Sequence, residues 1–235
     1  MFGMFMSLDP LYWALLGPAI ILATWAQYKV SSAYQNYARV PVRSGLSGAE
    51  AARSLLRRKG LDRVRIEQSS GWLSDHYDPS ERVLRLSPQV YSGRNVSSVG
   101  IAAHEAGHAL QHAQGYMPLE IRSTLVPVVQ IGSWLSWPML LGGFLLGSMG
   151  MLKLGIFTFG LLVVFQLITL PVEFDASSRA KQALLEMGVC NGREYEGVQD
   201  VLNAAAMTYV AAAVTALMQL LYFLIRAGLL GGGDE

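Results

Sequence analysis

The sequence has few charged residues and a single cysteine. Charged side chains make up 15% of the 235 residues, whereas 52% are hydrophobic. Ordinary soluble domains carry roughly 25% charged residues, so this imbalance favours a membrane protein in contact with a lipid bilayer. The net charge of +1 offers no strong field for an acidic or basic macromolecule, and we therefore expect no nucleic-acid partner. The lone Cys190 excludes an internal disulfide and is compatible with a reducing compartment.

Charge is absent from four long intervals of the chain, residues 10–28, 123–152, 154–172 and 201–225. A helix crosses the hydrocarbon core in about 20 residues, so each interval is long enough to span. Only Lys153 separates the middle two, within the Gly- and Met-rich "GSMGMLKLG", which predicts a tight helical hairpin. Gly143 and Gly147 have the spacing that permits close helix packing.

The expected fold is therefore mainly α, a polytopic membrane protein with four transmembrane helices and a small α+β cytoplasmic domain. We divide it into an N-terminal transmembrane helix (1–28), a cytoplasmic catalytic region (29–122), a transmembrane hairpin (123–172), a second cytoplasmic segment (173–200) and a C-terminal transmembrane helix (201–230).

The distribution of basic residues predicts the orientation. All Lys and Arg residues except Lys153 and Arg226 lie in 29–122 and 173–200. Basic residues near the ends of spans favour the cytoplasm, so we expect both segments to face the cytoplasm and both termini to lie outside. This predicts a multi-pass protein of the cell (inner) membrane. Because the hairpin crosses twice, the two polar segments lie on the same face.

The region 29–122 shows local signals of folded structure. "SGAEAARSLLRRKGL" places Ser47 three residues before Glu50, which is a capping box, and Gly60 is expected to end that helix. "VRIEQS" and "RVLRLS" alternate as strands do, and "HYDPSER" between them carries Asp-Pro turn chemistry. These segments predict a helix, a small antiparallel sheet or hairpin, and then a helix from about Ser97 to Gln114.

The stretch "AAHEAGHALQHAQGY" holds three of the four histidines. His104, Glu105 and His108 form HExxH. Helix positions i and i+4 lie on one face, about 6 Å apart along the axis, so both imidazoles can bind one zinc ion with bonds of about 2 Å. Glu105 can then take the proton of the zinc-bound water. Small residues around the motif suit a closely packed helix: Ala102, Ala103, Ala106, Gly107 and Ala109.

Two other histidines are weaker candidates. His112 lies eight residues beyond His104, about 12 Å along an unbroken helix, and no glycine lies between His108 and His112 to turn the chain back. We therefore expect His112 to be a surface residue or a neighbour of the site, and not a ligand. His76 in "SDHYDP" could bind metal or stabilise an oxyanion, or could be an ordinary hairpin histidine.

Two carboxylates in "LPVEFDASSRA" are candidates for the third ligand. Glu173 directly follows the third span, on the same membrane face as HExxH, and Pro171 is well placed to begin a new helical segment. Asp175 is a close rival. Residues two apart on a helix point to nearly opposite faces, so only one of the pair can be a ligand. Two histidines and one carboxylate leave a fourth position for water, as a catalytic zinc requires.

Three blocks in order, "LSDHYDPSERVLRLSP", "GRNVSSVGIAAHEAGHALQH" and "LPVEFDASSRA", closely resemble the YugP-type neutral zinc metallopeptidases of bacterial membranes. The resemblance covers nearly the whole chain. It implies a gluzincin-like zincin domain with His104, His108 and Glu173 as zinc ligands and Glu105 as catalytic base.

The chain is also similar, more distantly, to HtpX-type membrane peptidases, which carry Glu-x-x-x-Asp at this point. Here Glu173 matches the Glu, but the Asp position is occupied by Ser177. A metal-bound side chain needs a hydrogen-bonded partner to orient it, and this resemblance leaves Asp175 or Ser177 as that partner.

These features predict a membrane-anchored zinc endopeptidase that cleaves a protein or peptide substrate at the cytoplasmic interface. The strand region near Leu84 could bind substrate as an added strand. One alternative is an intramembrane metalloprotease, which needs HExxH within a span. The other is a non-catalytic zinc-binding scaffold, which would not require Glu105. No particular substrate or oligomeric state is indicated.

Overall fold

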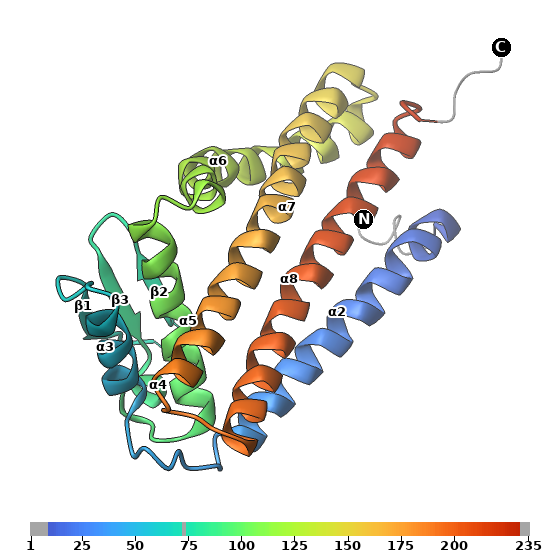
Figure 1. The fold of residues 1–235 in the computed structure, drawn as a ribbon. Helices are drawn as coiled ribbons and strands as arrows, with labels where there is room; N and C mark the ends of the chain where they lie inside the picture. Colours follow the sequence, from blue (N-terminus) through green and yellow to red (C-terminus); the bar gives the residue numbers. More distant parts are fainter. Residues whose placement is uncertain (1–8, 72–73, 231–235) are drawn as a thin grey trace. The chain divides into compact units, whose positions relative to one another are not determined.

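The computed structural model describes residues 9–71 and 74–230 (Figure 1). The expected segment 1–28 thus begins outside the described residues. The chain divides into two compact units. Unit 1 comprises Met1–Trp25, Ile121–Leu170 and Tyr209–Glu235, and unit 2 comprises Ala26–Glu120 and Pro171–Thr208. The boundaries of the five expected segments stay predictions.

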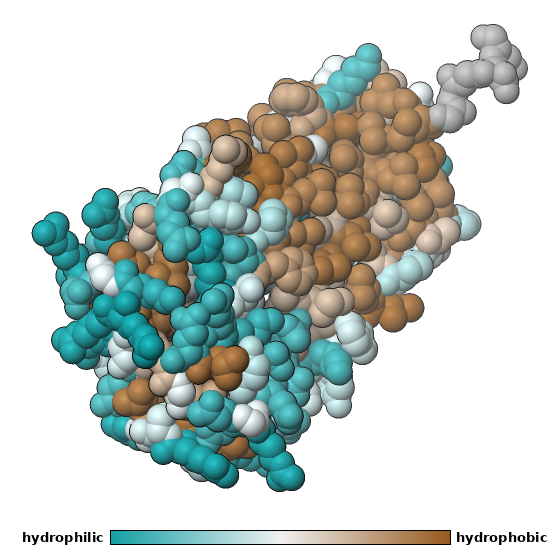
Figure 2. All heavy atoms as spheres, in the orientation of Figure 1, coloured by the Kyte–Doolittle hydropathy of each residue, from teal (hydrophilic) through white to brown (hydrophobic). Residues whose placement is uncertain are grey.

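Four long helices account for most of the chain: α2 (Pro10–Tyr37), α6 (Met117–Leu146), α7 (Met149–Glu186) and α8 (Arg193–Arg226). Within the described residues, α6, α7 and α8 are long and apolar enough to cross a membrane. Helix α2 is not among them, and a fourth span stays a prediction. Hydrophobic residues dominate the visible surface of the unit 1 helices (Figure 2).

The turn between α6 and α7 is shorter than the sequence suggests. Gly147, with φ of 65°, forms the turn together with Ser148, and Lys153 already lies inside α7. A Cβ atom on Gly143 would lie 2.7 Å from the Leu152 backbone nitrogen, so the close approach expected there is confirmed. Gly147 has no such neighbour within 4 Å. It serves the turn rather than helix packing.

Helix α7 runs without interruption through Pro171, so the prediction that Pro171 begins a new segment was wrong. The proline removes the backbone hydrogen bond to the carbonyl four residues earlier, and its ring crowds that carbonyl. Apolar helices tolerate such a loss where neighbouring groups compensate. As a result, Glu173 lies on the same continuous helix as the uncharged run 154–172.

Unit 2 also contains the shorter elements, in the order α3 (Gly48–Arg58), β1 (Arg65–Gln68), β2 (His76–Asp78), β3 (Val83–Leu86), α4 (Pro88–Ser92) and α5 (Val96–Ala113). The capping box of α3 is confirmed, with both the Ser47 and the Glu50 side-chain hydrogen bonds present. Gly60 follows the helix with φ of 74°. Helix α5 begins and ends one residue before the predicted bounds.

The sheet differs from the expected antiparallel pairing of 65–68 with 83–86. Strand β3 is central, parallel to β1 and antiparallel to β2. The prediction was wrong because "HYD" forms a strand itself. The Asp78 side chain accepts hydrogen bonds from the backbone N–H groups of Ser80 and Glu81, which closes a β2–β3 hairpin. Leu84 lies in the central strand, which is paired on both edges with Ile66 and Tyr77, so the expectation that this strand receives an added strand was also wrong.

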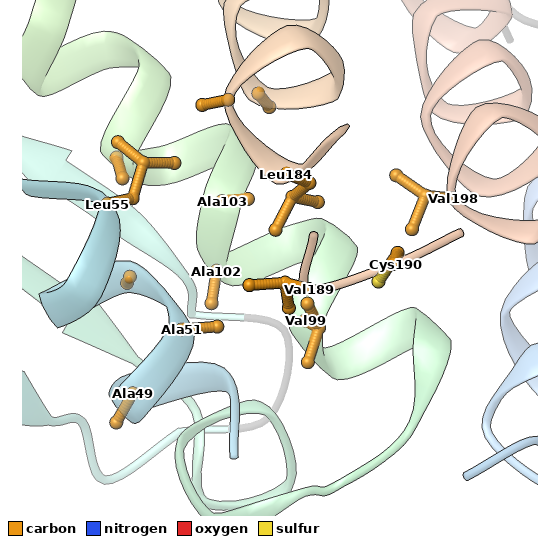
Figure 3. Close-up of a cluster of buried hydrophobic side chains, with 14 of the residues drawn as sticks. Ala49, Ala51, Leu55, Val99, Ala102, Ala103, Leu184, Val189, Cys190 and Val198 are labelled. Carbon is orange, nitrogen blue, oxygen red and sulfur yellow. The ribbon is translucent and has the colours of Figure 1, made fainter. Parts of the chain in front are cut away.

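The core of unit 2 forms around the HExxH helix. Helix α5 is lined by small side chains, among them Ala102 and Ala103, and larger ones such as Leu55 of α3 and Leu184 of α7 fill the space around it (Figure 3). All four residues are fully buried. Small residues let neighbouring helices approach α5 closely, and this positions the groups described next.

Candidate metal centre

The HExxH motif lies in the second half of α5. The helix begins at Val96, where the Asn95 side chain accepts a hydrogen bond from the Ser98 N–H. His104 and His108 then fall on one face, with ring centroids 4.8 Å apart, as the i, i+4 spacing predicts. His108 is buried and Glu105 is only 9% exposed, so the motif sits within unit 2.

Glu173 of α7 lies against both imidazoles. Its Oε2 atom is 3.1 Å from Nε2 of His104 and 3.6 Å from Nε2 of His108. A tetrahedral zinc ion with bonds of 2.0–2.1 Å separates neighbouring donors by about 3.3 Å. The three side chains therefore fit a zinc ion in both chemistry and spacing. Across residues 9–71 and 74–230, they are the one group of three such donors.

A glycine allows this approach of the two helices. A Cβ atom on Gly107 would lie 2.5 Å from the carbonyl oxygen of Ala176, which is closer than real side chains come. Gly107 lies between the two histidines in sequence, and Ala176 follows Glu173 by less than one turn. The absence of a side chain at Gly107 therefore brings the carboxylate within reach of the imidazoles.

The Nδ1 atom of each histidine has its own partner. Nδ1 of His104 lies 3.1 Å from Oγ of Ser177, and Nδ1 of His108 lies 2.9 Å from Oε1 of Gln111. Such contacts fix ring orientation and leave the Nε2 atoms for a metal. Ser177 thus contacts a histidine of the cluster, and its expected role as the partner that orients Glu173 stays a prediction.

Sequence reasoning missed the role of Gln111. Its side chain is fully buried, and its Nε2 donates to the Val172 carbonyl and to Oδ2 of Asp175, each at 2.8 Å. Asp175 therefore contacts α5 without entering the donor cluster. The available signal was the i, i+3 spacing from His108, which places Gln111 on the same helix face.

The cluster is rich in negative charge. Burial lowers the pKa of His108, but its hydrogen bond to Glu173 and the charge of Glu105 outweigh that effect, so the pKa of this imidazole lies above its usual value. Glu173 is 2% exposed. Two carboxylates beside two imidazoles, largely withdrawn from water, form a site that favours a cation.

The remaining histidines lie outside the cluster. Nδ1 of His112 is 2.9 Å from the Tyr77 hydroxyl, in agreement with the helix geometry that excluded His112 as a ligand. His76 is exposed, and its Nδ1 lies 2.7 Å from the Ser74 carbonyl. Alternate residues of a strand point to opposite faces, so Tyr77 of β2 contacts α5 and His76 does not join the site.

Comparisons with known proteins agree with this centre. Residues 12–228 match the family described as "Putative neutral zinc metallopeptidase". The chain is 49% identical over 217 residues to the "Putative membrane protease YugP" of Bacillus subtilis (strain 168), and the alignment covers 92% of this chain and 96% of that protein. No solved structure matches it. With a match that spans both α5 and α7, the chain belongs to this zinc metallopeptidase family.

Proposed function

We propose that the protein is a membrane-anchored zinc endopeptidase. In this proposal His104, His108 and Glu173 hold zinc, and Glu105 is the catalytic base. The observation that carries it is the convergence of the three donor atoms, at 3.1 and 3.6 Å, beside the carboxylate of HExxH. A purely structural zinc site is usually closed by four protein ligands, whereas these three side chains leave a position for a reactant.

In this proposal, different side chains of the protein transfer the proton and position the imidazoles. When bound, zinc supplies Lewis acidity toward a peptide carbonyl and lowers the pKa of a water molecule. The Glu105 carboxylate takes a proton from the attacking water and delivers it to the nitrogen of the leaving amine. Ser177 and Gln111 hold the two imidazoles in place through Nδ1, so that neither ring must reorient during the reaction.

The proposed location is the cytoplasmic interface of the cell membrane. Helices α6, α7 and α8 are long and apolar enough to span, and the Bacillus relative is named a membrane protease. Glu173 immediately follows the uncharged run 154–172. The basic residues of 29–122 and 173–200 favour the cytoplasm for both segments that carry the site.

No observation favours either alternative function, the intramembrane protease or the non-catalytic zinc-binding scaffold. An intramembrane protease would carry HExxH within a span, but α5 is not among the three described helices that could cross a membrane. A zinc-binding scaffold has no need for Glu105, which is not one of the three donors. The endopeptidase accounts for both features.

The substitution Glu105→Gln tests the proposal. It preserves the shape of the side chain and removes the base, so the purified full-length variant should keep zinc while peptide hydrolysis falls by about 10²–10⁴. Glu67→Gln is the control, because Glu67 of β1 is a half-exposed partner of Arg65, and this variant should behave as the wild type. Wild-type turnover by Glu105→Gln would exclude the proposed mechanism.

A further inference from the structure

We propose that Asp175, acting through Gln111, is a positioning residue that fixes the tautomer and the orientation of His108. The inference rests on the proposed zinc site. Neither Asp175 nor Gln111 is among the three donor residues. Both would act through His108, which is one of the three donors, by fixing which of its ring nitrogens carries the proton.

The argument begins with the two ends of the Gln111 amide. Its nitrogen contacts the Val172 carbonyl and the Asp175 carboxylate, both at 2.8 Å. Both partners are acceptors, so the NH₂ group must point toward them. The amide oxygen then points toward His108 and can only accept. Nδ1 of His108, 2.9 Å away, must therefore carry the proton.

This arrangement leaves the lone pair of the neutral imidazole on Nε2, which is the atom that faces Glu173. A metal requires that lone pair. His104 is held differently, because the Ser177 hydroxyl at its Nδ1 can either donate or accept. Of the two histidines, His108 is thus the one whose metal-binding tautomer is imposed by its surroundings.

Asp175 is itself held in place. Arg179, one turn further along α7, forms an ion pair with its Oδ2 and also donates to Oε1 of Gln114. The Arg179 guanidinium lies 5.6 Å from the centre of the Tyr116 ring. These contacts join α7 to the end of α5 and the residues after it, so the carboxylate that orients Gln111 is fixed from both helices.

The test compares zinc affinity in the full-length protein in detergent, measured by competition with a chromogenic chelator. Gln111→Met removes the acceptor at similar volume and should weaken zinc binding about 10–100-fold. Asp175→Asn keeps the shape and an acceptor oxygen but removes the charge, and should weaken binding by less. Gln182→Met is the control, because Gln182 is exposed on α7 and its side chain donates to Glu186 on the same helix. The zinc affinity of this variant should not change.

Asp175→Asn separates positioning from simple helix clamping. The substitution also removes the ion pair with Arg179, so a purely structural role predicts a lower melting temperature of the metal-free protein, while the proposed role predicts a loss of zinc affinity at an unchanged melting temperature. Wild-type affinity in both Gln111→Met and Asp175→Asn would overturn the inference. If Gln111→Met fails to fold, Asp175→Asn decides alone. If the wild type binds no zinc, the proposed function itself is wrong.

Discussion

Among single side chains, His112 shows that position on a helix decides a role as much as residue type does. It repeats the four-residue spacing of His104 and His108, yet it lies about 6 Å further along the axis than His108. Its Nδ1 is engaged by the Tyr77 hydroxyl. We therefore assign His112 to the contact between α5 and strand β2, and leave metal binding to the first two histidines.

His112→Ala should accordingly retain stoichiometric zinc, whereas His108→Ala should lose it. The first substitution removes one hydrogen bond, worth about 1 kcal/mol of stability, and the second removes a metal donor. Metal analysis of the two purified variants, with unfolding curves for both, checks this pair. Zinc-free but folded His112→Ala protein would contradict the assignment.

At the level of elements, the contact between α5 and α7 creates the centre. Neither helix carries a complete site, since α5 supplies two imidazoles and α7 supplies the carboxylate. Gly107 sets their separation, because its missing side chain leaves room for the Ala176 carbonyl. Gly100, on the same helix, has a different neighbour. A Cβ atom there would meet Val198 of α8 at 3.6 Å, which is ordinary contact.

This difference predicts opposite outcomes for two identical substitutions. Gly107→Ala should force α5 and α7 apart, destabilise the protein by about 1–3 kcal/mol and weaken zinc binding. Gly100→Ala should fold normally, or gain up to about 1 kcal/mol because alanine favours a helix over glycine. Thermal unfolding and zinc content of both variants provide the measurement. Equal behaviour of the two would show that the helix separation is not set at Gly107.

For the molecule as a whole, local features were predictable and distant pairings were not. The capping box of α3 and the HExxH face of α5 depend on residues within a turn or two, and both follow from sequence spacing. The parallel β1–β3 pairing depends on a crossover that no local pattern specifies. Gln111 was missed because its role depends on Asp175, which lies on another helix. Helix geometry alone left Glu173 and Asp175 as rivals. The family resemblance favoured Glu173, and the packing of α7 on α5 brings the Glu173 carboxylate to both imidazoles.

The orientation of the chain in the membrane is a prediction at this scale. Cys190 is fully buried, and burial raises the pKa of its thiol to about 12, so the native cysteine should react poorly with thiol probes. A cysteine at Ser148, in the α6–α7 turn, should react in intact cells. One at Ser80, in the exposed β2–β3 turn, should react only after permeabilisation. Labelling of Ser80→Cys from outside would invert the proposed topology.

The central claim is that His104, His108 and Glu173 together bind zinc, and the most direct measurement is the zinc content per chain of Glu173→Ala. Glu186→Ala is the matched control, because Glu186 lies on the same helix but contacts Lys59 and Gln182 at the surface. We predict one zinc per chain in the wild type and in Glu186→Ala, and loss of zinc from folded Glu173→Ala protein. Stoichiometric zinc in Glu173→Ala would contradict the account.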